Sequence, residues 1–151
     1  MMTKESITKQ LKEKGLKLTP QRLAIIDVLI EKKDLHPGAC LVHGGAKKKK
    51  KSLSLSSTYA TLNELSRHGI IKTLQFDKME NRYEGNLEEH INLICERCKK
   101  IVDYKVSIGV DQRDVAKKTG FSITDTRLEY YGLCRECRKE KGRKGGPRKT
   151  N

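Results

Sequence analysis

Tryptophan is absent from this sequence, and aromatic residues make up only 5% of its 151 residues. Apolar residues of all kinds reach 35%, which is enough for small cores, especially where a bound metal ion supplements them. No apolar run approaches the roughly 20 residues that a membrane-spanning helix requires, and the first residues lack the apolar stretch of a signal peptide. These absences predict a cytoplasmic protein with no membrane partner, in a compartment where thiols stay reduced.

Acidic residues are also in short supply. The chain has 19 of them against 33 lysines and arginines, which gives a net charge of +14. Such an excess favours a polyanionic partner, and nucleic acid is the first candidate, with a merely basic solvated surface as the alternative. The sequence contains no recognisable motif for a nucleophile–base pair, a glycine-rich phosphate loop or paired catalytic carboxylates. An enzyme is therefore not predicted.

Four of the five cysteines occur in two pairs, Cys95 with Cys98 and Cys134 with Cys137, each with two residues between the thiols. One tight turn can aim both sulfurs of a pair at one point, and two turns supply the four thiolates of a closed structural zinc site. Two disulfides are the first alternative, and they are disfavoured because nothing marks the chain as secreted. A redox pair needs to begin a helix, whereas Cys95 follows a strand-like run. Four unrelated buried thiols are the remaining alternative, and Cys40 has no assigned role.

The first 84 residues carry signals for helices followed by a hairpin. Thr19-Pro20 is a strong helix start, because threonine caps a helix and proline fits its first turn. Helical signals lie at residues 3–14, from 20 onward and at about 56–68, and strand signals follow at 70–76 and 82–84. This order predicts an α+β chain with a winged helix-turn-helix domain over residues 1–84. In that fold the helix before the hairpin reads the bases, and the hairpin contacts the backbone of the DNA.

Residues 39–51 stand where a further helix belongs, but they lack the usual helical signals. Gly44 and Gly45 each cost about 1 kcal/mol relative to alanine in a helix, and Lys47 to Lys51 are five like charges in a row. The segment is therefore predicted to be mobile or only partly helical.

The helix predicted at about 56–68 has two different faces. Thr58, Leu62 and Leu65 recur at helical spacing and are predicted to be core. The opposite face is polar, as a helix in a major groove requires, with a plain solvated face as the alternative. The candidate DNA-binding residues are Ser56, Tyr59, Asn63 and Arg67 of this face, and Arg22 in the first turn of the helix that begins at Pro20.

The remaining sequence predicts a second, smaller domain over residues 85–137. Strand-like runs lie at 90–94, 100–106 and 121–131, with a helix at about 109–118 that Gly120 closes. This is a small α/β unit with the cysteine site at its edge. Residues 138–151 are rich in lysine, arginine and glycine, so they are predicted to be a disordered basic tail.

Several motifs occur in a fixed order along the chain. They are Leu18-Thr19-Pro20-Gln21-Arg22, His36-Pro37, Gly69-Ile70-Ile71, Arg82-Tyr83-Glu84, Ile94-Cys95-Glu96-Arg97-Cys98 and Leu128-Glu129-Tyr130-Tyr131-Gly132-Leu133-Cys134. With these motifs the sequence resembles the ferric uptake regulator (Fur) family of metal-dependent repressors, over about residues 16–137. The resemblance implies that residues 85–137 form a dimerisation domain and that a homodimer binds a palindromic double-stranded DNA operator.

The resemblance also implies a second, regulatory metal site at the hinge between the domains. The positions that match it here are His36, Glu84, His90, Asn92 and Asp103. Imidazole and carboxylate ligands suit Fe²⁺ or Mn²⁺, and also Zn²⁺. Because the ligands come from both halves of the chain, a bound ion would favour one arrangement of the two domains.

Three residues depart from the family pattern. Asn92 stands where relatives usually carry histidine, and an amide oxygen is a weaker and harder ligand than imidazole. Glu84 is more usual in iron-uptake regulators, whereas peroxide-sensing members often carry aspartate. Ala60 stands where many members carry arginine, which removes a DNA contact. We therefore expect a metal-responsive repressor that controls iron uptake. Peroxide sensing and zinc uptake are the alternatives within the family, and a zinc-ribbon RNA-binding protein is the alternative outside it.

Overall fold

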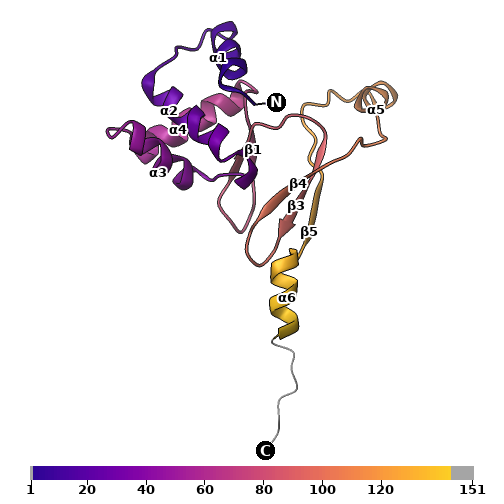
Figure 1. The fold of residues 1–151 in the computed structure, drawn as a ribbon. Helices are drawn as coiled ribbons and strands as arrows, with labels where there is room; N and C mark the ends of the chain where they lie inside the picture. Colours follow the sequence, from indigo (N-terminus) through magenta and orange to yellow (C-terminus); the bar gives the residue numbers. More distant parts are fainter. Residues whose placement is uncertain (1, 144–151) are drawn as a thin grey trace, which may run out of the picture. The chain divides into compact units, whose positions relative to one another are not determined.

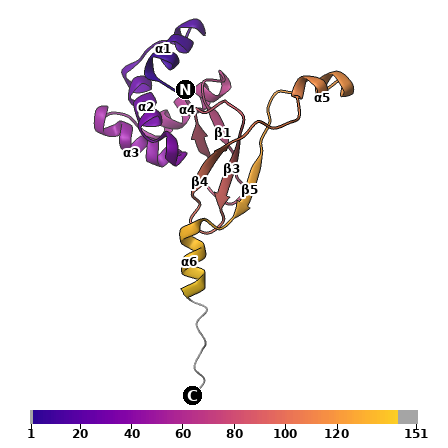
Figure 2. The same cartoon turned by 45° about the vertical axis from the view of Figure 1, so that its right-hand side comes forward.

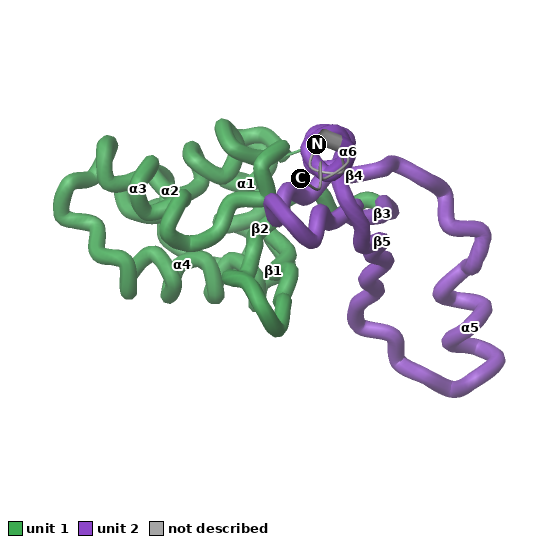
Figure 3. The backbone as a smooth tube through the Cα atoms, turned by 90° about the horizontal axis from the view of Figure 1, so that it is seen from below, with its two compact units in different colours: residues 1–88 green, residues 89–151 purple. Residues whose placement is uncertain are grey.

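A computed structural model describes residues 2–143 of the chain. They fall into two compact units, Met1–Glu88 and Glu89–Asn151 (Figure 3). The predicted domain boundary lies a few residues earlier, between residues 84 and 85. Helix and sheet are mixed, and among the described residues no helix is long and apolar enough to cross a membrane.

The first unit contains four α-helices and a two-stranded antiparallel hairpin (Figure 1). The helices are α1 (Lys4–Glu13), α2 (Pro20–Glu31), α3 (Ala39–Lys49) and α4 (Leu55–Arg67), with a short 3-10 turn η1 (Lys33–Leu35), and the hairpin strands are β1 (Lys72–Leu74) and β2 (Arg82–Glu84). The side chains of Thr3, Thr19 and Ser54 cap α1, α2 and α4, each accepting a hydrogen bond from a backbone N–H in the first turn. This is the element order that the sequence predicts.

The core of the first unit lies between its helices. Thr58, Leu62 and Leu65 on α4 are completely buried, as predicted. From α2, Ile26 and Leu29 enter the same core. Burying these side chains removes apolar surface from water, which supplies the main stabilisation of a small helical domain.

Helix α3 contradicts the prediction of a mobile or partly helical segment. It is a regular helix over Ala39–Lys49, and its buried side chains are Ala39, Val42 and Ala46. A Cβ atom at Gly45 would lie only 2.9 Å from Cγ2 of Val28 on α2. The glycine therefore permits a close approach of the two helices, and this packing outweighs its low helix propensity.

An ion-pair network also holds α3 against its neighbours. The ammonium of Lys49 lies 2.8 Å from Oε1 of Glu31 and 3.4 Å from Oδ2 of Asp27, both on α2. Lys4 of α1 pairs with the other oxygen of Asp27 at 2.8 Å. At least one lysine of the basic block thus has carboxylate partners. The sequence alone did not show which residues these partners are.

The second unit is built on a three-stranded sheet of order β4-β3-β5 (Figures 1 and 2). Its elements are β3 (His90–Cys95), β4 (Ile101–Lys105), α5 (Gln112–Thr119), β5 (Glu129–Gly132) and α6 (Arg135–Arg143). Strand β3 runs antiparallel to β4 and parallel to β5. Gly120 closes α5 in the left-handed conformation, with φ of 73°, as expected.

Two predictions for the second unit are corrected. The predicted strand over 121–131 is a strand only from Glu129, where pairing with β3 begins. The predicted disordered tail, residues 138–151, begins instead as part of α6, which continues to Arg143. The rest of that stretch lies outside the described residues.

Candidate functional site

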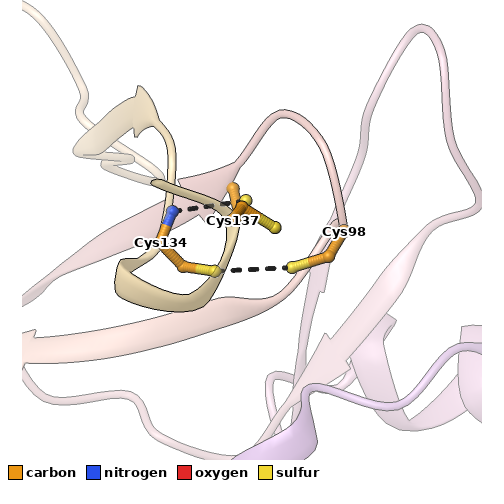
Figure 4. A group of neighbouring side chains, drawn as sticks. Cys98, Cys134 and Cys137 are labelled. Atoms are coloured by element: carbon orange, nitrogen blue, oxygen red, sulfur yellow. Dashed lines mark hydrogen bonds between the residues drawn. The ribbon is translucent and has the colours of Figure 1, made fainter. Parts of the chain in front are cut away.

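The four paired cysteines come together in the second unit. One ligand sulfur from each of Cys95, Cys98, Cys134 and Cys137 lies within 4.8 Å of all the others. Figure 4 shows Cys98 and Cys134 facing one another, with 3.8 Å between their sulfurs. In a tetrahedral zinc site with Zn–S bonds of about 2.3 Å, the sulfurs stand about 3.8 Å apart. The cluster therefore has the dimensions of a structural zinc site.

The sheet and two tight turns position these thiols. Parallel pairing of β3 with β5 sets Cys95 beside Gly132, which brings the two cysteine turns to the same end of the sheet. Each turn is closed by a backbone bond of 2.9 Å, from the N–H of Lys99 to the carbonyl of Cys95 and from the N–H of Arg138 to that of Cys134. Short local turns therefore fix the direction of all four sulfurs.

The electrostatics of the cluster suit a cation. The backbone N–H of Cys134, 3.4 Å from the Cys95 sulfur, and then that of Cys98 lower the pKa of the Cys95 thiol to about 6. Burial and neighbouring thiols raise the pKa of Cys137 to about 12. One thiolate thus forms readily, whereas the charge of a divalent ion is needed to displace the proton of Cys137.

The alternatives to zinc fit this geometry less well. All described cysteines are free thiols, so the pairs do not form disulfides. The second pair, unlike the first, stands at the start of a helix, because Cys134 directly precedes α6. A redox pair, however, requires only two thiols, and here all four converge on one point.

Arg97, in the first cysteine turn, ties that turn to α6. Its guanidinium donates to the carbonyl of Cys137 at 3.4 Å and pairs with Glu140 at 3.1 Å. Outer partners of this kind orient metal ligands. Sequence reading missed this role, because Glu140 lies far from Arg97 along the chain.

In the first unit, His36 and Glu84 form a buried pair. Nε2 of His36 lies 3.4 Å from Oε2 of Glu84, and each side chain is only 2% exposed. His36 follows η1 in the left-handed conformation, with φ of 47°, a region that few non-glycine residues adopt. An imidazole and a carboxylate held side by side are suitable ligands for a divalent transition metal.

Strand β2 holds the backbone around His36 in place. Arg82 donates from Nη1 to the carbonyl of His36 at 3.1 Å, and the N–H of Tyr83 donates to the carbonyl of Pro37 at 3.0 Å. An isolated β-bridge joins Arg82 to Gly38. The hairpin strand that carries Glu84 is therefore also the strand that positions His36.

In the second unit, His90, Asn92 and Asp103 lie on one face of the sheet. His90 and Asn92 are two residues apart on β3, and Asp103 stands opposite Asn92 on β4. Nε2 of His90 lies 3.9 Å from Oδ1 of Asp103. The buried Oδ1 of Asn92 has no hydrogen-bond partner among the described residues. Glu129 of β5 stands opposite Asn92 on the same face. Its carboxylate accepts hydrogen bonds from Arg127 and from the hydroxyl of Tyr131. The sequence did not indicate that this carboxylate lies beside Asn92.

The other face of this sheet exposes large apolar side chains. Leu93 of β3 stands between Val102 of β4 and Tyr130 of β5 in the strand register. Tyr104 lies two residues from Val102 on the same face, and all four side chains are exposed. Neighbouring exposed apolar side chains of this kind are typical of interaction surfaces.

The polar face of α4 is exposed. Ser56, Tyr59, Asn63 and Arg67 are all open to solvent, as a helix that enters a groove of DNA requires. The remaining candidate, Arg22, is different, because its side chain is only 17% exposed and pairs with Glu64 of α4. Its guanidinium is therefore already engaged within the unit.

Comparison with known proteins agrees with this geometry. The ferric uptake regulator family matches residues 13–131. The peroxide operon regulator of Bacillus subtilis is 35% identical over 132 residues, which cover 86% of this chain and 90% of that protein. The solved structure of the Helicobacter pylori Fur protein, reported to have three functional metal-binding sites, gives a TM-score of 0.69 at 29% identity, with 90% of this chain and 94% of that one covered. The ferric uptake regulator of Francisella tularensis, solved with iron, gives 0.67 at 28% identity, with 82% and 96% covered.

These matches extend over both units, and they confirm the predicted fold class and the resemblance on which the metal and DNA-binding roles were based. The chain belongs to the ferric uptake regulator family, whose members are metal-responsive transcriptional regulators that bind DNA as dimers, and not enzymes.

Proposed function

We propose that this chain is a homodimeric repressor of the cytoplasm that binds a palindromic operator in its metal-loaded state and controls iron uptake. The observation that carries the proposal is that both units offer the same kind of metal ligands. Each unit, taken by itself, places one histidine and one carboxylate side by side, His36 with Glu84 and His90 with Asp103.

The regulatory ion takes these two pairs as its ligands. Two side chains are fewer than the four to six ligands that Fe²⁺ or Mn²⁺ requires, so one pair alone makes a weak site. Asn92 supplies a further oxygen from the same sheet face as His90 and Asp103. An ion that needs ligands from both units binds best to one arrangement of them, and that arrangement fits the operator.

Zinc has the structural role in this proposal. Four thiolates complete the tetrahedral set, so that no position stays open for regulation. The ion joins the end of β3 to the start of α6, and thereby completes a unit with few buried apolar residues of its own.

The exposed faces support the proposed dimer and its DNA contacts. A second copy covers the apolar sheet face of Leu93, Val102, Tyr104 and Tyr130, because a self-complementary patch of this kind suits a two-fold interface. In each copy the polar face of α4 enters a major groove, with Ser56, Tyr59, Asn63 and Arg67 toward the DNA.

Peroxide sensing is the second candidate, and a specific observation favours it. The peroxide-responsive regulators of Bacillus subtilis and Staphylococcus epidermidis are 35% and 34% identical to this chain. In such a sensor, bound Fe²⁺ would lead to oxidation of a ligand histidine. We prefer iron uptake because position 84 is glutamate, which is the more usual residue of the iron-uptake regulators.

Operator binding at controlled metal concentration tests the proposal. Zinc-loaded protein is titrated onto DNA from upstream of its own coding sequence, with Mn²⁺, with Fe²⁺ or with chelator. The proposal predicts tight, sequence-selective binding only with the ion, and binding that ignores chelator contradicts it. Mass spectrometry after peroxide treatment separates the two candidates, since added mass on His36 or His90 that requires iron identifies a peroxide sensor.

A further inference from the structure

Arg22 differs from the other candidate DNA contacts because its charged side chain is paired with a carboxylate of its own unit. Its Nη2 lies 2.5 Å from Oε2 of Glu64, and its Nη1 donates to the carbonyl of Lys17 at 2.6 Å. Its backbone N–H donates to the capping hydroxyl of Thr19 at 3.2 Å. The residue thus joins the loop before α2, the first turn of α2, and α4.

The ion pair is sheltered from solvent. The side chains are 17% exposed for Arg22 and 25% exposed for Glu64. Charge-assisted hydrogen bonds in such surroundings are stronger than those of fully exposed pairs, because water screens them less. These two bonds occupy both terminal nitrogens of Arg22, so a two-pronged contact with a phosphate would compete with them. A guanidinium already neutralised by Glu64 also adds little net attraction for the phosphate.

Glu64 lies on α4 beside the residues proposed to contact DNA, so its ion pair with Arg22 can affect how that face is held. Glu64 directly follows Asn63 and precedes Arg67 by three residues, so it flanks the polar face proposed to read DNA. Helix α2 packs chiefly against α3, and its own contact with α4 is narrow. The ion pair is a polar contact across this narrow interface between α2 and α4, and it lies beside the polar face.

We infer that Arg22 is a positioning residue for α4: its ion pair with Glu64 orients the reading helix, and Arg22 does not itself contact phosphate. The inference rests on the proposed role of α4. Because small errors in the orientation of a recognition helix misplace several base contacts at once, loss of either partner weakens operator binding.

The test compares Arg22→Gln and Glu64→Gln in the full-length, metal-loaded protein by fluorescence anisotropy. The probe is a duplex that the wild-type protein enriches from a random-sequence pool, titrated at several salt concentrations. Both variants should weaken binding by about tenfold, the loss expected when one base contact of α4 is misplaced. The slope of log affinity against log salt should not change, because no phosphate contact is lost. The double variant should lose no more than either single one.

A direct phosphate contact predicts different results for both variants. Glu64→Gln would then remove a negative charge beside the DNA and release Arg22, so that binding tightens. Arg22→Gln would reduce the salt slope by about 0.9. Either result overturns the inference, and so does wild-type affinity in both variants. Should Arg22→Gln fail to fold, the sign of the effect of Glu64→Gln decides alone.

Two controls complete the design. Glu13→Gln removes an exposed ion pair of the same unit, with Lys9 on α1, and should bind as the wild type does. An equal loss in this control would overturn a specific role for Glu64. The exchange of Arg22→Glu with Glu64→Arg should recover part of the affinity. If the wild-type protein enriches no particular sequence from the pool, the proposed function is contradicted. The same variants, measured on any duplex that the protein binds, then decide the inference about Arg22.

Discussion

The two units achieve stability by different means. The first has a contiguous apolar core that draws on all four of its helices and on Tyr83 of the hairpin. In the second, the described buried apolar residues are few, namely Ile91, Ile94 and Ile101 with two of the clustered cysteines. A unit with so little buried apolar surface depends on additional bonds. The difference shows that packing stabilises the first unit, and we propose that metal and a partner copy stabilise the second.

The largest effect is expected from Cys95→Ser. Apparent binding free energies of structural zinc are about 10–16 kcal/mol, so losing one thiolate should unfold the second unit and abolish dimers. Zinc analysis and analytical ultracentrifugation measure both outcomes. Cys40→Ser is the matched control, since this exposed thiol belongs to neither cysteine pair. An intact dimer without zinc would contradict the claim that the second unit depends on the metal for its stability.

Truncation of the apolar core should act on the other unit. Ile26 is completely buried on α2, and Ile26→Ala should destabilise the first unit by about 2–5 kcal/mol. Zinc content should stay at the wild-type level, because the thiols belong to the second unit. Thermal unfolding monitored together with zinc release measures this separation. Simultaneous loss of both signals would show that the two units do not unfold independently.

Replacing Asn92 by histidine should raise the affinity of the regulatory site for its metal ion. Asn92 is buried on the sheet face of His90 and Asp103, and imidazole is a better ligand than an amide for a transition metal. Asn92→His should tighten Fe²⁺ binding, measured without oxygen, by about tenfold, which is at least the effect of one outer partner of a ligand. Calorimetric titration measures the affinity. Asn86→His in the preceding loop is the control, and an equal gain there would remove position 92 from the proposed site.

The smallest effect distinguishes the two adjacent glycines of α3. Gly44→Ala meets no atom within 4 Å and should stabilise the helix by about 1 kcal/mol. Gly45→Ala brings its methyl group against Val28, so crowding of about 1–3 kcal/mol should cancel or exceed that gain. Chemical denaturation of both variants measures the difference. Equal stabilisation would contradict the close approach of α3 to α2.

Features set by neighbouring residues could be predicted from the sequence. The cap at Thr19, the helix end at Gly120 and the buried face of α4 each depend on a few adjacent positions, and the structure confirms them. The cysteine pairs were recognisable for the same reason, because their spacing within each turn is local. Local signals, however, do not show which distant segments pack together.

The features that sequence reading missed all depend on distant partners. Helix α3 is stabilised by Val28 and by the carboxylates of α2. Arg22 is bound by Glu64, which follows it by 42 residues. The position of Glu129 opposite Asn92 depends on the register of β5 against β3. Such contacts are set by tertiary packing, which overrides local propensity.

The central claim is that one regulatory ion takes ligands from both units, and equilibrium titration with Mn²⁺ tests it most directly. Zinc-loaded wild-type protein is compared with His36→Ala, His90→Ala and the double variant. The account predicts one regulatory ion per chain in the wild type, a loss of about 10–100-fold in affinity in each single variant, and little further loss in the double variant. Wild-type affinity in either single variant, or losses that simply add, would contradict it.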